Sequence, residues 1–177
     1  MVAKPDGPRV PAPEHQARFW SLIEAAWAPL GPEVRQARQA LVVRAAGSPA
    51  DTSVVAGALR GFLDVLAGHC RGLPGAELTS LDRVLERKLW EIDRADVHAV
   101  TGGSDDGFLY SRGFIVAVGR EFYGSVVDTP EMAVPWAECE EMCYFFAQLY
   151  RDRFGDFPVT GSGISRESGS NLVGWAR

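Results

Sequence analysis

The chain has 177 residues, of which 46% are hydrophobic and 10% aromatic, and its formal net charge is −5. This length and composition suffice for one domain with a hydrophobic core, and they exclude disorder of the whole chain. The charge shows none of the clustered lysine and arginine that a phosphate backbone requires, so we expect no binding to nucleic acid.

Further features of the composition indicate a bacterial, cytoplasmic protein. Only Lys4 and Lys88 among the 18 basic residues are lysine, a bias typical of GC-rich bacterial genomes. No apolar run approaches the roughly 20 residues that cross a bilayer, and the amino terminus lacks the hydrophobic segment of a signal peptide, so we expect no membrane partner. Cysteines are odd in number, and we expect reduced thiols at Cys70, Cys139 and Cys143.

The first half of the chain shows three amphipathic helical patterns after a proline-rich leader. Residues 1–13 contain four prolines, which predicts a flexible leader outside the domain. Apolar residues at helical spacing predict helices over 14–28, which Pro29 ends, and over 32–47. A third helix is expected to begin at the capping pattern Ser48–Asp51 and to bury one stripe, consisting of Val55, Leu59, Phe62 and Leu66.

The second half of the chain predicts three longer helices. An apolar face runs unbroken over residues 81–99, which corresponds to about five helical turns. Residues 108–126 are apolar around most of the helical circumference, which predicts a central, buried helix. A last helix is expected between Pro135 and Gly155, and residues 156–177 form an irregular tail in which Trp175 could anchor the end of the chain.

These patterns together indicate the fold class. No segment shows the alternating pattern of a β-strand, and no internal repeat or change of composition marks a boundary between domains. We therefore predict an all-α protein, a single compact domain of five or six helices that spans residues 14–155. The leader and the irregular C-terminal tail flank this domain.

The stretch with the most chemistry is Val100–Arg112, which contains the sequence Gly-Gly-Ser-Asp-Asp-Gly. If Ser104 is a helix N-cap, Asp105 and Asp106 fall in the first turn of the next helix. There the free backbone N–H groups and the helix dipole favour negative charge by about 0.3–1 kcal/mol for each residue. This structural interpretation requires no ligand.

A functional interpretation applies to the same residues. Arg112 lies seven residues after Asp105, on nearly the same helix face but about 10 Å further along the axis, so the two could hold a polar ligand between them. Other groups of the stretch would add hydrogen bonds to such a ligand. The remaining candidate ligand-binding residues are therefore Gly102, Gly103, Asp106 and Tyr110.

Candidates for catalysis and metal binding are fewer. His98 could transfer a proton near neutral pH, and Asp105 and Asp106 are the other candidate catalytic residues. We predict no metal site and no cofactor, because Cys139 and Cys143 form no Cys-x-x-Cys pair and the spacings of calcium and phosphate loops are absent. The aromatic residues expected to form core or groove walls are Trp20, Trp27, Trp90 and Trp136.

Several stretches also carry a likeness to a known family. They are Phe19–Glu24, Leu89–Trp90 and above all Gly102–Arg112, with the pattern GGSDDGF-x-Y-x-R, and with later segments they extend over residues 14–158. By these residues the chain resembles a bacterial family known as domain of unknown function 4240. The resemblance implies a small helical bacterial protein and no particular reaction, and it directs attention to Asp105, Asp106, Tyr110 and Arg112.

Our leading functional hypothesis is a binding domain that recognises a small polar molecule or a protein segment through Asp105, Asp106, Tyr110 and Arg112. One alternative is an enzyme of a biosynthetic or modifying pathway that uses the same residues. Another is an immunity-like or regulatory module that binds a protein partner over an acidic face. The three hypotheses require, respectively, a polar pocket, a proton-transfer group beside it, and an exposed apolar or acidic surface.

Overall fold

The computed structural model describes residues 8–176, which are 69% helical and contain no strand. The predicted all-α class is confirmed. Within the described range there are ten α-helices, eight of them seven residues or longer, so the predicted number of five or six helices is wrong. Residues 1–7 of the predicted leader lie outside the described residues, and Arg9 donates its backbone N–H to the carbonyl of Gly161 in the tail (2.9 Å).

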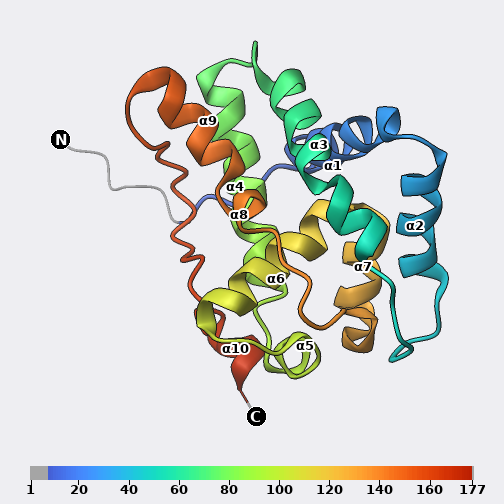
Figure 1. The fold of residues 1–177 in the computed structure, drawn as a ribbon. Helices are drawn as coiled ribbons and strands as arrows, with labels where there is room; N and C mark the ends of the chain where they lie inside the picture. The colour runs from blue at the N-terminus through green and yellow to red at the C-terminus, as the bar shows by residue number, and fades with distance from the viewer. Residues whose placement is uncertain (1–7, 177) are drawn as a thin grey trace.

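The arrangement of the helices is shown in Figure 1. In chain order they are α1 (Pro13–Trp27), α2 (Pro32–Val43), α3 (Ser53–Cys70), α4 (Gly75–Glu91), α5 (Ala95–Thr101), α6 (Asp105–Val118), α7 (Arg120–Asp128), α8 (Glu140–Cys143), α9 (Phe145–Phe154) and α10 (Leu172–Trp175). Short 3-10 turns follow α1 and α7, at Ala28–Leu30 and Pro130–Met132.

Each of the three long helices predicted in the second half of the chain is divided in two. These divisions explain most of the difference between the predicted and the observed number of helices. Between α6 and α7, Gly119 has a φ of 123°, which is not helical and which glycine adopts without steric cost. Between α8 and α9, the carbonyl of Cys143 accepts a hydrogen bond from Arg166 (2.7 Å). Between α4 and α5, the carbonyl of Trp90 accepts one from Asn171 (3.0 Å). Two of the three breaks therefore have their partners in the tail.

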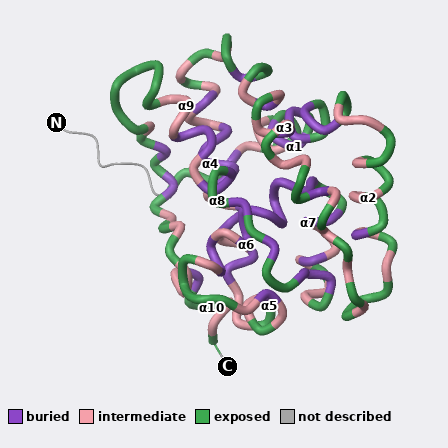
Figure 2. Tube along the Cα trace, viewed as in Figure 1, coloured by how far each residue is buried: buried purple, intermediate pink, exposed green. Residues whose placement is uncertain are grey.

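The core is built around α6. Ten of its 14 residues are buried, and it packs against α4, α5, α7 and α8. Figure 2 shows this burial in the middle of the molecule. α4 lies beside α6 and also packs against α1, α8 and α9, while α1 stacks Trp27 on Phe62 of α3 with the ring centroids 4.4 Å apart. The position of α6 agrees with the apolar circumference predicted for it.

The described part of the tail, residues 156–176, runs back along α4 and ends beside α5 (Figure 1). Near its start, Arg83 of α4 donates to the carbonyl of Thr160 (2.6 Å). Near its end, Trp175 donates its ring N–H to Asp93, which follows α4 (2.9 Å). The tail is mostly without helix, as predicted, but it is joined to the helical body along its length.

Gly113 tests the close contact between α6 and α8. A methyl group at this position would lie 2.6 Å from Sγ of Cys143 and against the carbonyl oxygen of Cys139. The carbonyl of Cys139 belongs to the backbone that leads into α8, so it cannot move aside without shifting that helix. We therefore expect Gly113→Ala to lower the free energy of unfolding by about 1–3 kcal/mol. Urea denaturation followed by circular dichroism measures this change.

Gly57→Ala on α3 is the matched control, because its methyl group would meet no atom within 4 Å. Alanine loses less conformational entropy than glycine in a helix, so this substitution should raise stability by up to about 1 kcal/mol. A stabilising effect of both substitutions would contradict the tight packing described for Gly113.

Candidate functional site

The turn between α5 and α6 has the predicted capping geometry. The hydroxyl of Ser104 accepts the backbone N–H of Gly107 at 3.2 Å, and Asp105 begins α6. Gly102 and Gly103 have φ values of 69° and 96°, in the left-handed region that favours glycine. The predicted cap at Ser104 is therefore confirmed, and Asp105 and Asp106 lie in the first turn of α6.

Carboxylates from two segments meet on the surface at this turn. The loop before α8 lies against the first turn of α6, since a methyl group on Gly107 would be 3.3 Å from Oε1 of Glu138. The charges of Glu140 and Asp106 both act on the phenol of Tyr110. All four acids at this place are exposed. We call them the acidic face: Asp105, Asp106, Glu138 and Glu140.

Tyr110 lies beside the carboxylates of the acidic face. Partial loss of hydration, and after it the charges of Glu140 and Asp106, raise the pKa of the Tyr110 phenol above its ordinary value. A phenol titrates later when its anion would face other anions. Loss of hydration is the largest cause of this shift, and the carboxylates of the acidic face add to it.

Trp136 lies exposed beside the acidic face. It is 75% exposed, and it is the one residue other than glycine with a positive φ, 60°, among residues 8–176. Its ring covers Gly102, where a methyl group would be 3.5 Å from a ring carbon, and its backbone N–H donates to the carbonyl of Thr101 (3.4 Å). Sequence patterns predicted a core or groove role for Trp136, and this exposure excludes a core role.

His98 packs beneath the same turn. Its Nε2 is 3.1 Å from the carbonyl oxygen of Gly103. The ring meets Phe108 edge-on with centroids 4.9 Å apart, and it lies 5.5 Å from the ring of Trp175 in the tail. These contacts make His98 a link between α5, the start of α6 and the tail.

Arg112 does not join the acidic face, because its side chain is fully buried. Its Nη1 donates to the carbonyl of Leu89 in α4 (3.0 Å). Its Nη2 donates to the carbonyl of Arg166 and to the hydroxyl of Ser168, both in the tail and both at 3.0 Å. The structure thus directs Arg112 into an internal hydrogen-bond network and separates it from Asp105, with which it was expected to hold a ligand.

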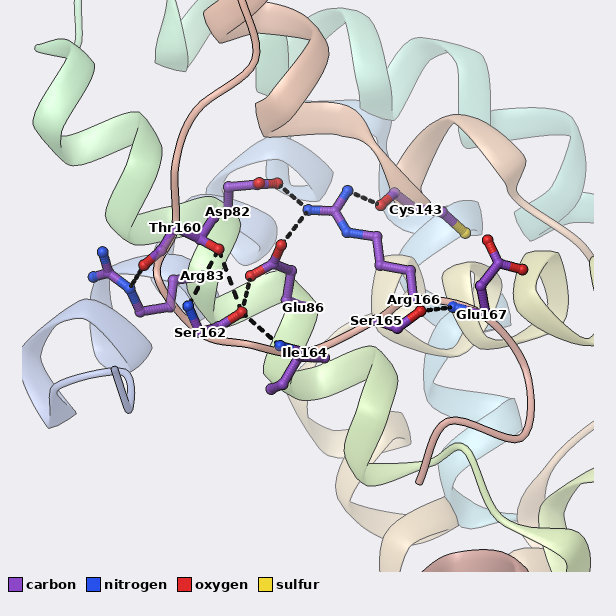
Figure 3. Close-up of polar contacts among 10 residues, drawn as sticks. All are labelled: Asp82, Arg83, Glu86, Cys143, Thr160, Ser162, Ile164, Ser165, Arg166 and Glu167. Carbon is purple, nitrogen blue, oxygen red and sulfur yellow. Dashed lines mark hydrogen bonds and ion pairs between the residues drawn. The ribbon is translucent and has the colours of Figure 1, made fainter. Parts of the chain in front are cut away.

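A buried ionic network lies next to Arg112, between α4 and the tail (Figure 3). Nη2 of Arg166 donates to Oδ1 of Asp82 at 2.7 Å and lies 3.5 Å from Oε1 of Glu86. The hydroxyl of Ser162 donates to the other oxygen of Glu86 (2.7 Å). Asp82 is only 2% exposed, and this burial raises its pKa to about 6 in spite of the nearby guanidinium.

Asp93 forms a second buried junction with the tail. Burial alone would raise the pKa of Asp93, but hydrogen bonds and the charge of Arg112 outweigh it and hold that pKa below its ordinary value. The carboxylate accepts four hydrogen bonds of 2.9–3.2 Å, and their donors are Gly169, Ser170, Asn171 and Trp175.

The sequence patterns did not single out this network, although a signal for it exists. Asp82, Glu86 and Asp93 follow one another at spacings of four and seven residues, so they share one helix face. Each directly follows a residue of the apolar stripe that predicted α4. Polar residues at such positions indicate buried partners, but the partners themselves lie in a segment with no regular pattern.

The three cysteines are free and buried. Burial raises the pKa of Cys70 to about 11 and those of Cys139 and Cys143 to about 12, so they are protonated thiols packed as small apolar groups. Within residues 8–176, no three or more His, Cys, Asp or Glu side chains are grouped as metal ligands. No helix in this range has the length and apolarity needed to cross a membrane.

Comparison with known proteins gives one match. The family model described as protein of unknown function (DUF4240) matches residues 15–152. No curated protein and no solved structure matches the chain. The matched range contains the acidic face together with Asp82, Asp93 and Arg112, whereas Arg166 and the tail around it lie beyond the match.

Arg112→Lys tests whether the hydrogen bonds of the Arg112 guanidinium stabilise the fold. A single ammonium cannot reproduce the planar fork that reaches three acceptors, so buried carbonyls would be left without donors. We expect the free energy of unfolding, measured by urea denaturation, to fall by about 2–4 kcal/mol. Arg71→Lys, at an exposed position, is the control and should change it by less than about 0.5 kcal/mol. An unchanged stability for Arg112→Lys would contradict the network.

The raised pKa of Asp82 predicts the direction in which the free energy of unfolding changes with pH. Its pKa in the folded protein is about 6, above the ordinary value of 3.8, so the folded state binds this proton more tightly than the unfolded state. The stability gained from protonation is fully present below about pH 4 and is lost as the pH rises through 6. The unfolding free energy of the wild type minus that of Asp82→Asn should therefore fall by about 1–3 kcal/mol between pH 4 and pH 7.

Urea denaturation of both proteins at the two pH values measures this difference. Titrating groups that do not contact Asp82 or Arg166 contribute equally to both proteins and cancel. A difference that rises with pH would mean that Arg166, rather than burial, governs the titration of Asp82, and it would contradict the expected sign.

Proposed function

The chain belongs to the DUF4240 family of proteins of unknown function, and we propose that it is a protein-interaction module that recognises a basic polypeptide segment. The contact surface is the acidic face with Trp136 at its edge. The observation that carries the proposal is the exposed ring of Trp136, fixed on the Gly102 turn beside four carboxylates.

The conformation of Trp136 supports a role in binding. A residue other than glycine in the left-handed region costs of the order of 1–3 kcal/mol, and such residues cluster at functional sites. Because the Trp136 ring is 75% exposed, its burial within the chain offsets little of this conformational cost. Tryptophan is also among the residues that most often dominate the energy of a protein interface. A partner that covers the ring would supply the missing burial.

The charge of the acidic face supports a basic partner. Asp105 and Asp106 come from α6, whereas Glu138 and Glu140 come from the segment at the start of α8, so the fold concentrates carboxylates from distant parts of the chain. A complementary segment would carry lysine or arginine next to an apolar or cationic group that packs on the Trp136 ring. The net charge of −5 adds long-range attraction to such a partner.

The positions of Arg112 and His98 favour a polypeptide over the other hypotheses for this surface. A small polar ligand held between Asp105 and Arg112 would need the guanidinium that is instead buried among Leu89 and the tail. An enzyme would need a free proton-transfer group, and Nε2 of His98 is engaged by the turn. We further propose that the interaction takes place in the bacterial cytoplasm, in line with the free cysteines.

Fluorescence polarisation with labelled peptides that combine lysine or arginine with leucine tests the proposal. We expect the wild type to bind such peptides, with an affinity that falls as salt is added, because surface charges are screened over about 8 Å at physiological ionic strength. Trp136→Ala should weaken binding about tenfold or more. Asp105→Asn combined with Asp106→Asn should weaken it mainly at low salt.

Matched controls remove the same chemistry elsewhere. Phe157→Ala removes another exposed aromatic ring, 47% exposed, and Glu14→Gln with Glu33→Gln neutralises first-turn acids of α1 and α2. Both control proteins should bind as the wild type does. Absence of peptide binding, or equal losses in the control and test variants, would refute the proposal.

A further inference from the structure

A second candidate site lies between α1, α2 and α7, on the side of the molecule that α2 and α7 form in Figure 1. It is a cavity of about 360 Å³, a volume within the range of small-molecule sites. None of its lining residues belongs to the acidic face. Its charged lining consists of Arg35 and Arg38 of α2, Arg120 and Glu121 of α7, and Glu24 of α1.

Arg38 is held rigidly in the wall of this cavity. Its Nε donates to the carbonyl of Val118 (2.8 Å), and its Nη2 lies 2.9 Å from both carboxylate oxygens of Glu24. The guanidinium also stacks over the ring of Trp27 at 4.9 Å from the centroid. These contacts use Nε and Nη2, and among the described residues Nη1 has no hydrogen-bond partner. Because the side chain keeps 15% exposure, Nη1 is available to a ligand.

Gly119 shapes the backbone around this pair. Its φ is 123°, and a methyl group there would lie 2.5 Å from Nη2 of Arg38 and against Oε1 of Glu24. Any side chain at this position would push the ion pair away from the carbonyl of Val118. The break between α6 and α7 therefore fixes the direction of a guanidinium at the cavity wall, and an arginine held in this way loses little entropy when it binds an anion.

The other two arginines of the cavity are free to bind. Arg35 and Arg120 are exposed, and within residues 8–176 neither guanidinium has an ion pair or a side-chain hydrogen bond. Glu24 is occupied by Arg38 on both oxygens, so Glu121 is the remaining negative charge of the lining. Three guanidinium groups around one cavity thus leave an excess of positive charge in a protein whose net charge is negative.

We propose that this cavity binds a small organic molecule that carries a phosphate group. Arginine forks match the geometry of phosphate, and three of them offer more donors than the two oxygens of a carboxylate accept, whereas a phosphate presents three strong acceptor oxygens. The organic part of the ligand lies on the apolar portion of the lining at Val42, which is partly exposed.

Isothermal titration calorimetry of the full chain with phenyl phosphate tests this site. At constant ionic strength we expect one saturable site for phenyl phosphate, weaker binding of inorganic phosphate because it lacks the apolar part, and weaker binding of benzoate because it is a carboxylate. Arg35→Ala combined with Arg120→Ala should reduce the affinity for phenyl phosphate about tenfold or more. Both positions are exposed, so circular dichroism should show an unchanged fold.

Arg60→Ala combined with Arg71→Ala is the matched control, because it removes the same charge from exposed positions outside the cavity. This control and Trp136→Ala should both bind phenyl phosphate as the wild type does. No saturable binding, equal losses in the test and control pairs, or tighter binding of benzoate than of phenyl phosphate would overturn the proposal. These outcomes are independent of whether the acidic face binds a basic peptide.

Discussion

The structure depends on the neutralisation of charges buried between α4, α6 and the tail. Asp82, Asp93 and Arg112 are each removed from water, and a buried charge without partners costs several kcal/mol. The helices supply only some of these partners, such as the carbonyl of Leu89 for Arg112. Arg166 reaches Asp82, tail donors surround Asp93, and a tail carbonyl and hydroxyl meet Arg112. A segment without regular secondary structure therefore completes the core of a helical protein.

This constraint also determines what the surface presents. Because Arg112 is drawn inward by Leu89 and the tail, the carboxylates of Asp105 and Asp106 at the start of α6 have no arginine beside them on the acidic face. At the other end of α6, Gly119 ends the helix and sets Arg38 at the wall of the arginine-lined cavity. One buried helix thus separates a negative surface, where we propose peptide binding, from a positive cavity, where we propose phosphate binding.

Local signals in the sequence predicted the parts of this arrangement that depend on neighbouring residues. The all-α class, the burial of α6 and the cap at Ser104 follow from spacings within one helix or turn. Two of the three helix breaks and the inward direction of Arg112 did not follow from local signals. The carbonyls of Cys143 and Trp90 accept hydrogen bonds from tail residues that are 23 and 81 positions away in the sequence. The seven-residue spacing between Asp105 and Arg112 does not show whether Arg112 faces solvent or a segment that returns to cover it. The exposure of Trp136 did not follow either, because its residue type was compatible with both the core and a groove wall.

The tail is an integral part of the domain and is held there by buried charge. Hydrogen–deuterium exchange of the full chain, read by mass spectrometry, measures how firmly the tail is held against the helices. We expect residues 160–175 to be protected nearly as strongly as α4, and we expect Asp93→Asn to speed exchange in the tail and at the junction of α4 and α5 together. Rapid exchange throughout the tail of the wild type, with α4 and α6 still protected, would contradict this expectation.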